Sequence, residues 1–228
     1  MKNKFRIAVL IIGVLAAVPY SFGTQLIFEP TVGSFVDFVP LAPGYGNNVV
    51  ATNQGGYKYD LSGGATPNVV TQYATAGMPT IYTWAEDFGD LHHVIFAQEP
   101  QVFQFKLIAD PGFLVTLNSF DMASWPHLDY TINSVEVQDG NGATLFLQGN
   151  PLIEGDSSGP QHTHFSFSGV QAQTLNIIFD STNVDSDDVG IDNINFSQTT
   201  AGVPEPASFV MLGSGLLGLL CYRWQRRR

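Results

Sequence analysis

Between residues 25 and 197, apolar and polar side chains alternate in several short segments, and no stretch keeps the spacing of an amphipathic helix for long. In VFQFKLIA (102–109), Phe103, Phe105 and Leu107 would share one face, whereas Gln104 and Lys106 would point the other way. TLNIIFD (174–180) and HFSFSGV (164–170) show the same alternation. A period of two in short, aromatic-rich segments predicts half-buried β-strands.

Turn residues separate these segments. SVEVQDGNGATLFLQG (134–149) predicts two strands joined at Asp139-Gly140-Asn141-Gly142, because these residues adopt the backbone conformations of tight hairpin turns. Many short strands at regular spacing predict an all-β fold, an antiparallel β-sandwich of jelly-roll type, over residues 24–198. About 180 residues can bury a core without disulfides. The one cysteine, Cys221, lies outside this domain.

The N-terminus carries the features of a secretory signal peptide over residues 1–23. MKNKFR supplies three positive charges, IAVLIIGVLAAV supplies an apolar run, and Ser21-Phe22-Gly23 supplies a small-residue exit. We therefore expect cleavage between Gly23 and Thr24. A retained anchor helix is the alternative, and the small-residue exit argues against it.

The C-terminus predicts a second membrane segment. After a short linker at 199–202, residues 203–228 read VPEPASFVMLGSGLLGLLCYRWQRRR. The apolar stretch 207–222 is slightly shorter than the roughly 20 residues of a typical transmembrane helix. By the positive-inside rule, the segment 223–228 would stay cytoplasmic through its arginines, which are Arg223, Arg226, Arg227 and Arg228.

The order of these three parts resembles the PEP-CTERM sorting signal of Gram-negative bacteria. The motif residues are Val203, Pro204, Glu205 and Pro206. The resemblance implies that an exosortase cuts the tail after transient anchoring in the inner membrane. It further implies release to the cell surface or extracellular matrix, in species that make exopolysaccharide or biofilm. We expect a non-enzymatic protein. An ordinary single-pass anchor would share the topology but lack the Pro-Glu-Pro.

Charge is distributed unevenly along the chain. Between the two terminal segments, residues 24–206 hold all twenty acidic residues but only Lys58 and Lys106, a formal charge of about −18. Such a surface repels phosphates, so nucleic acid is excluded as a partner. It attracts cations, which makes a divalent metal a natural partner.

The two ends of the predicted domain suggest where a metal would bind. LIFEP (26–30) and VGIDNINF (189–196) resemble the first and last strands of jelly-roll carbohydrate-binding modules. In that fold the first and last strands lie close together. Glu29 and Asp192 would then face one structural calcium ion, with Asn47 or Asn48 and backbone carbonyls completing the shell. The alternative is an exposed Glu29 and an Asp192 that caps a turn.

Three further patterns leave alternatives open. A glycan-binding module would use exposed aromatic rings as a stacking platform, the candidates being Tyr57, Tyr59, Tyr82, Trp84 and Trp125. A secreted hydrolase would use Ser157 in EGDSSGP (154–160), although turn composition explains that segment. His162 and His164 would face the same way on a strand and could coordinate a metal, although a solvent-facing polar stripe explains them better.

Overall fold

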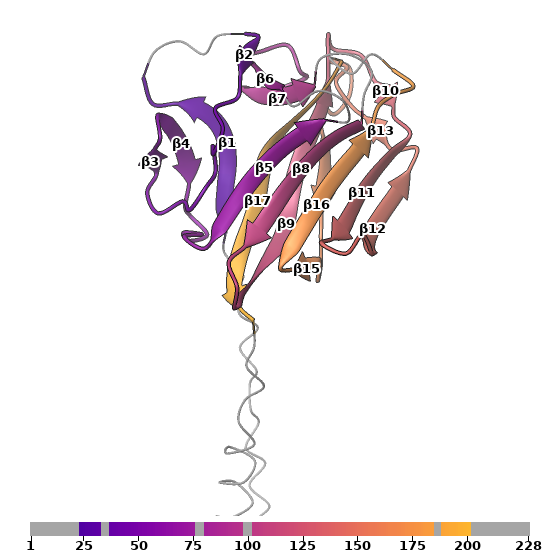
Figure 1. Ribbon diagram of the computed structural model, residues 1–228. Helices are drawn as coiled ribbons and strands as arrows, with labels where there is room; N and C mark the ends of the chain where they lie inside the picture. Colours follow the sequence, from indigo (N-terminus) through magenta and orange to yellow (C-terminus); the bar gives the residue numbers. More distant parts are fainter. Residues whose placement is uncertain (1–22, 33–36, 76–79, 98–101, 185–187, 202–228) are drawn as a thin grey trace, which may run out of the picture.

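The computed structural model describes residues 23–32, 37–75, 80–97, 102–184 and 188–201 (Figure 1). The described residues contain no α-helix, and none of their segments forms a helix able to cross a membrane. The strands follow in order: β1 (Thr24–Pro30), β2 (Val39–Pro40), β3 (Asn53–Gln54), β4 (Tyr57–Asp60), β5 (Val69–Thr75), β6 (Ile81–Trp84), β7 (Val94–Ala97), β8 (Val102–Ala109), β9 (Phe113–Ser124), β10 (Tyr130–Thr131), β11 (Ser134–Asp139), β12 (Thr144–Gly149), β13 (Leu152–Ile153), β14 (Thr163–Ser166), β15 (Gln171–Ala172), β16 (Thr174–Asp180) and β17 (Val189–Thr200).

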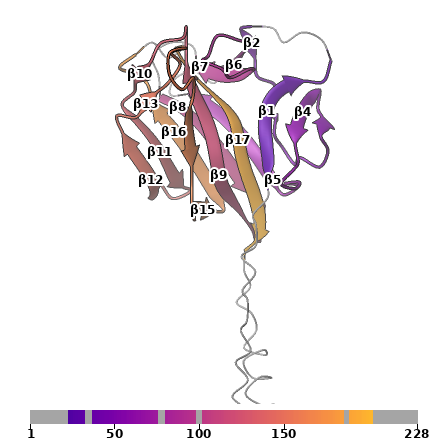
Figure 2. The ribbon, with the colours of Figure 1, turned by 180° about the vertical axis from the view of Figure 1, so that it is seen from behind.

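Two large sheets, antiparallel throughout, make up the domain. The smaller one has the strand order β12-β11-β16-β8-β5 and lies in front in Figure 1. The larger one contains β2-β6-β7-β17-β1-β4-β3, with β9 joining β17 to β14 and β15. Figure 2 shows this second sheet from behind, with β9 and β17 at its centre. The predicted all-β, antiparallel class is therefore confirmed, whereas the jelly-roll connectivity stays a prediction.

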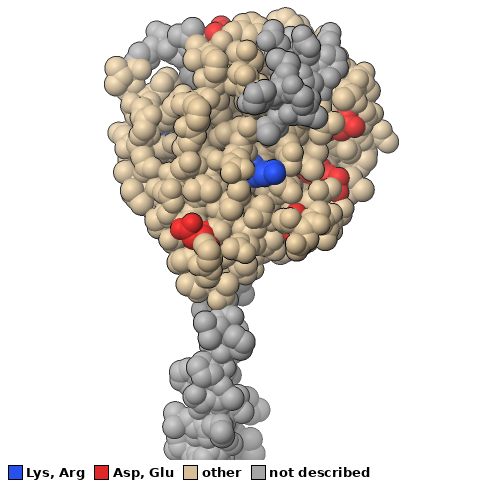
Figure 3. Space-filling model, viewed as in Figure 1, with Lys and Arg blue, Asp and Glu red and all other residues tan. Residues whose placement is uncertain are grey.

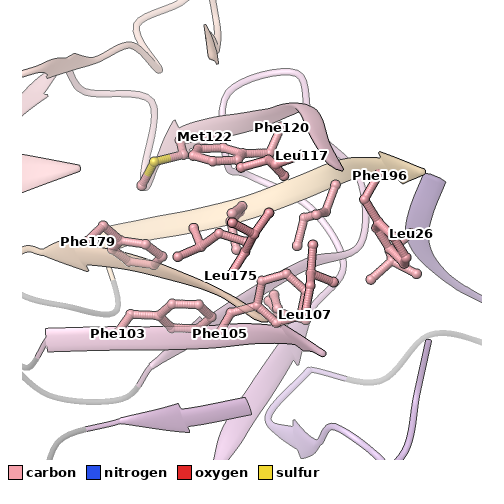
Figure 4. Close-up of a cluster of buried hydrophobic side chains, with 14 of the residues drawn as sticks. Leu26, Phe103, Phe105, Leu107, Leu117, Phe120, Met122, Leu175, Phe179 and Phe196 are labelled. Atoms are coloured by element: carbon pink, nitrogen blue, oxygen red, sulfur yellow. The ribbon is translucent and has the colours of Figure 1, made fainter. Parts of the chain in front are cut away.

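The main core lies between the two sheets, and the alternation in the sequence creates it. Along β8, exposure alternates at every residue, so that Phe103, Phe105 and Leu107 are fully buried. Leu175 and Phe179 of β16 point to the same side, and Figure 4 shows Phe120 of β9 facing them across the core. Burying each such side chain stabilises the fold by about 1.5–3 kcal/mol.

The predicted hairpin at 134–149 is present as β11 and β12. Val137 pairs with Phe146, and the register shifts by one residue before the turn. The Asp139 carboxylate accepts backbone hydrogen bonds from Asn141 and Ala143 at 2.8 and 2.9 Å. Gly142 has a φ of +84°, a conformation that L side chains rarely adopt. The turn residues thus act as the sequence predicts.

The first and last strands are neighbours, as the sequence analysis expects. Thr24 of β1 pairs with Phe196 of β17. Gly23 packs closely against the backbone of Phe196, because a Cβ at position 23 would be 2.1 Å from the Phe196 carbonyl oxygen. Both described ends of the domain consequently leave at the same pole, the lower one in Figures 1 and 2. β17 also continues to Thr200, two residues past the predicted end of the domain at 198.

A second, smaller hydrophobic cluster lies apart from the main core. It consists of Phe88, Leu91, Val94, Phe96 and Ala123, with Tyr82, Trp84 and Trp125 packed against it. Gly190 of β17 lets this cluster approach the sheet, because a Cβ there would lie 2.9 Å from atoms of both Phe88 and Val94. We call this group the outer cluster.

Candidate functional site

The outer cluster opens into a small cleft lined by Phe38, Trp84, Phe88, Phe96 and Trp125, called here the aromatic cleft. Its volume is about 50 Å³, and its lining is mainly apolar. β2, β6 and β7, which carry or flank several of these rings, lie at the upper pole in Figure 1, whereas the chain ends leave at the lower pole. The aromatic cleft therefore lies at the pole opposite the one where the described ends of the chain, Gly23 and Ala201, are found.

The rings of the aromatic cleft contact one another mainly by their edges. Trp84 lies between Phe38 and Trp125, with ring centroids 4.8 and 6.2 Å away and interplanar angles of 86° and 70°. Phe88 and Phe96 form the buried floor, 6.1 Å apart. Trp84 and Trp125 are half-buried, so part of each ring surface stays open to solvent.

Phe38 is held in an unusual conformation at the rim. Its φ is +56°, in the left-handed region that a bulky residue rarely occupies, and 46 % of the residue is exposed. Its backbone is fixed by a hydrogen bond from Phe38 N to Thr83 O at 3.0 Å. The neighbouring Asp37 carboxylate accepts a hydrogen bond from Ala85 N at 2.8 Å. A strained, solvent-facing aromatic ring at a cleft is a recurrent feature of binding sites.

Several polar groups lie close in sequence to the residues that line the aromatic cleft. His127 Nε2 lies 3.6 Å from Asp87 Oδ1, and both side chains are largely exposed. Trp125 N donates a hydrogen bond to Asp188 O, which fixes the backbone of that ring. The indole N–H of Trp125 is buried and has no hydrogen-bond partner among the described residues. A buried donor left without an acceptor costs about 1–3 kcal/mol.

The five aromatic residues suggested by the sequence divide between two places. Tyr57 and Tyr59 contact Tyr45 in the main core, with ring centroids 4.6 and 5.1 Å from it. Tyr82, Trp84 and Trp125 pack on the outer cluster instead. Residue type alone did not reveal Phe38, Phe88 or Phe96 as members of the cleft, because long-range contacts between loops bring them together.

The three residues predicted as calcium ligands have separate partners. Glu29 forms an ion pair with Lys58, and Asn47 Oδ1 accepts a hydrogen bond from Thr71 N at 2.6 Å. Asp192 is buried and accepts a hydrogen bond from Asn193 N at 2.7 Å. Within the described ranges, no group of three or more His, Cys, Asp or Glu side chains is placed to hold a metal. Calcium binding stays a prediction.

Asp192 instead lies opposite a second carboxylate. It pairs directly with Asp121 across β17 and β9. Burial raises the pKa of Asp192 well above its ordinary value, the hydrogen bond from Asn193 N opposes this, and the nearby Asp121 charge raises it further. Burial thus disfavours the charged form of the Asp192 carboxyl.

Ser157 lies in an exposed turn. Asp129 accepts hydrogen bonds from Gly155 N and Asp156 N at 3.0 Å, and Asp156 accepts one from Ser158 N at 2.9 Å. Among the described residues, no hydrogen bond joins Ser157 to a histidine. These contacts match the turn interpretation of EGDSSGP.

The remaining predicted site residues fall mostly outside the described part of the chain. Gly23 and Thr24 are described, and Thr24 is buried in β1 with its hydroxyl donating to Gly64 O at 3.1 Å. The signal segment before residue 23, the apolar helix 207–222 and the arginines of 223–228 lie outside the described residues. So do the motif residues Val203, Pro204, Glu205 and Pro206.

Comparison with known proteins bears on the tail alone. Residues 202–228 match the PEP-CTERM protein-sorting motif, which supports an exported protein that an exosortase processes. No curated protein matches the chain. A cyclase from Fischerella sp. TAU, solved in complex with 4-(1H-indol-3-yl)butan-2-one, is 15% identical with a TM-score of 0.34, covering 74% of this chain and 100% of its own.

The enzymatically active domain of tailspike protein 4 from bacteriophage CBA120 is 13% identical with a TM-score of 0.26, covering 61% of this chain and 20% of its own. Both TM-scores are too low to support an inference about fold or activity. The sorting tail is therefore the part of the chain that the comparisons identify: a PEP-CTERM motif at residues 202–228.

Proposed function

We propose that this exported protein binds polysaccharide at the cell surface or in the extracellular matrix, without catalysis, through the aromatic cleft. The observation that carries the proposal is the half-exposed pair Trp84 and Trp125, with Phe38 beside them, at the pole opposite the chain ends. Flat aromatic rings bury the apolar faces of sugars, and nearby polar groups accept or donate hydrogen bonds to hydroxyls.

The position of the cleft supports this role. A domain held by its C-terminal tail presents the opposite pole away from the membrane, and that pole carries the aromatic cleft. The indole N–H of Trp125 is buried, so the proposal rests on the exposed parts of the aromatic rings and not on this donor. Asp87 and His127, which are close in sequence to Phe88 and Trp125, are exposed groups able to form hydrogen bonds.

Charge narrows the class of polysaccharide. The segment 24–206 has a formal charge of about −18, and acidic side chains are scattered over the face seen in Figure 3 rather than gathered in one place. A net negative surface opposes the approach of anionic polymers. We therefore infer a neutral exopolysaccharide as the ligand, in keeping with a role in biofilm.

The test is binding of the full chain, in detergent, to an array of neutral and uronate-containing polysaccharides. Wild type should retain neutral glycans, and Trp84→Ala or Trp125→Ala should weaken binding at least about tenfold, the equivalent of 1.4 kcal/mol. Phe113→Ala is the matched control, because Phe113 is a half-buried ring at the start of β9, where it pairs with Thr200 near the lower pole. Unchanged binding in both tryptophan variants would refute the proposal.

A further inference from the structure

His162 lies in the bend just before β14, and His164 lies within that strand, which pairs with β9 in the larger sheet. Phe165, the next residue, points inward, where it is buried and contacts Phe120 with ring centroids 5.1 Å apart. Side chains alternate along a strand, so His164 points outward, whereas His162 lies in a bend that immediately precedes β14 and is half-buried. The side chains are 35% and 55% exposed for His162 and His164, respectively.

Each of these imidazoles is held by an aspartate through the same ring nitrogen. His162 Nδ1 lies 2.7 Å from Asp90 Oδ1, and His164 Nδ1 lies 2.6 Å from Asp121 Oδ1. A carboxylate accepts hydrogen bonds, so each Nδ1 carries the proton and the lone pair is left on Nε2. This is the arrangement that fixes the tautomer and orientation of metal-binding histidines.

The aspartate behind His164 is itself held in place. Asn193 Nδ2 donates to Asp121 Oδ2 at 2.9 Å, and Gln25 Nε2 donates to Asn193 Oδ1 at 2.7 Å. The chain of hydrogen bonds therefore runs across four strands, β14, β9, β17 and β1. Asp121 is buried, with 9% exposure, which limits its freedom to turn away.

The aspartate behind His162 is placed by a close backbone contact. Gly89 has a φ of +54°, and a Cβ there would be 1.7 Å from the carbonyl oxygen of Gln161. The glycine thus lets the loop that carries Asp90 press against the residue just before His162. Two independent segments of the fold consequently direct Asp90 and Asp121 onto two histidines that lie two residues apart in the sequence.

We propose that His162 and His164 bind a transition-metal ion, Zn²⁺ or Cu²⁺, through their Nε2 atoms. Residues two apart in a chain are separated by at most about 7 Å, a spacing that two imidazoles can bridge with metal–nitrogen bonds of about 2.0–2.1 Å. Nitrogen ligands select such metals over calcium and magnesium. The strong negative charge of the domain raises the local concentration of any cation.

The proposed site has two protein ligands and water in the remaining positions. This follows from the described residues, among which no third His, Cys, Asp or Glu joins the pair. Such a site is open to a further ligand. It uses none of the residues that line the aromatic cleft, so it goes beyond the proposed polysaccharide binding and is tested separately.

The experiment is a titration of the full chain, in detergent and without a histidine tag, with Zn²⁺ by calorimetry and with Cu²⁺ by electron paramagnetic resonance. One metal ion per chain should bind, and the Cu²⁺ spectrum should show coupling to imidazole nitrogen. His162→Ala and His164→Ala should each weaken binding at least tenfold, and Asp90→Asn should weaken it about 10–100-fold by releasing the first imidazole. Excess Ca²⁺ should not displace the metal.

His127→Gln is the matched control, since His127 is also an exposed histidine close to an aspartate but stands alone. It should bind Zn²⁺ as the wild type does. Wild-type affinity in the His162→Ala/His164→Ala double variant would overturn the proposal, because surface carboxylates would then account for the binding. Absence of any Zn²⁺ uptake by the wild type would overturn it equally, leaving the two aspartate contacts as structural ion pairs.

Discussion

The main core and the outer cluster bury the same kinds of side chain in different ways. In the main core, strands from both sheets contribute every second residue, and rings such as Phe103 and Phe179 stack 4.3 Å apart at an interplanar angle of 15°. In the outer cluster, much of the packing comes from short strands and loops, the rings meet mostly by their edges, and Trp84 and Trp125 stay half-exposed.

This difference predicts that the main core contributes mainly to the stability of the fold and that the outer cluster contributes mainly to ligand binding. Fully enclosed rings contribute their whole burial to the free energy of unfolding, whereas a half-exposed ring contributes only part of it. The surface that remains open on Trp84 and Trp125 is available to a ligand. If the proposed function holds, the two hydrophobic clusters serve two purposes, and substitutions in each should have distinguishable effects.

The largest expected effect is on the main core. Phe103→Ala should lower the free energy of unfolding by about 3–5 kcal/mol, because the fully buried ring leaves a cavity against Phe179. Urea unfolding of the full chain in detergent, followed by tryptophan fluorescence, measures this loss. Trp84→Ala should lower stability clearly less while abolishing glycan retention. A cost for Trp84→Ala equal to that for Phe103→Ala would remove the distinction between the clusters.

The contrast between the main core and the outer cluster also explains which parts of the fold were predictable from the sequence. The alternation in 102–109 and 174–180 determines which residues face the main core, since period two is a local property of a strand, and β8 and β16 follow it. The hairpin at 134–149 was likewise predictable from its turn residues. The adjacency of the first and last strands came from a resemblance and is present in β1 and β17.

The candidate site was predictable only in part. The sequence indicates Trp84 and Trp125 as aromatic candidates, but nothing local to the sequence places Phe38 in the same cleft, because its contact with Trp84 joins residues 46 positions apart. The aspartate partners of His162 and His164 lie 72 and 43 positions away for the same reason. Glu29 and Asn47 are predicted as calcium ligands. In the structure, the Glu29 carboxylate instead forms an ion pair with Lys58, and Asn47 Oδ1 accepts a hydrogen bond from Thr71 N.

A smaller effect is expected at the rim of the aromatic cleft. At a φ of +56°, glycine is favoured over any residue with a Cβ. Phe38→Gly should therefore be about 1 kcal/mol more stable than Phe38→Ala, although alanine is the larger residue. Both variants should lose glycan binding to a similar extent, since both remove the ring. Urea unfolding compares the two stabilities, and a more stable alanine variant would show that Phe38 is not strained.

The last expected effect concerns Asp192, which is buried in β17 and pairs with Asp121 of β9. A carboxyl whose pKa is higher in the folded chain than in the unfolded chain binds its proton more tightly when folded. The stability that this carboxyl contributes is then complete below its ordinary pKa of 3.8. It is lost as the pH rises from there through the higher pKa of the folded chain. Asp192→Asn keeps the acceptor for Asn193 N and removes the titration.

Asp192→Asn should consequently match the wild type near pH 4 and become progressively more stable than the wild type as the pH rises toward neutrality. Thermal unfolding of the full chain, with a chelator present so that calcium does not contribute, measures this difference at each pH. Asp139→Asn is the opposing control, because hydrogen bonds from Ala143 N and Asn141 N lower the pKa of Asp139. That variant should be less stable than the wild type at neutral pH and approach it on acidification. If Asp192→Asn instead loses stability as the pH rises, the carboxylate at 192 is charged and favourable in the folded state, and a bound cation becomes the better explanation of its burial.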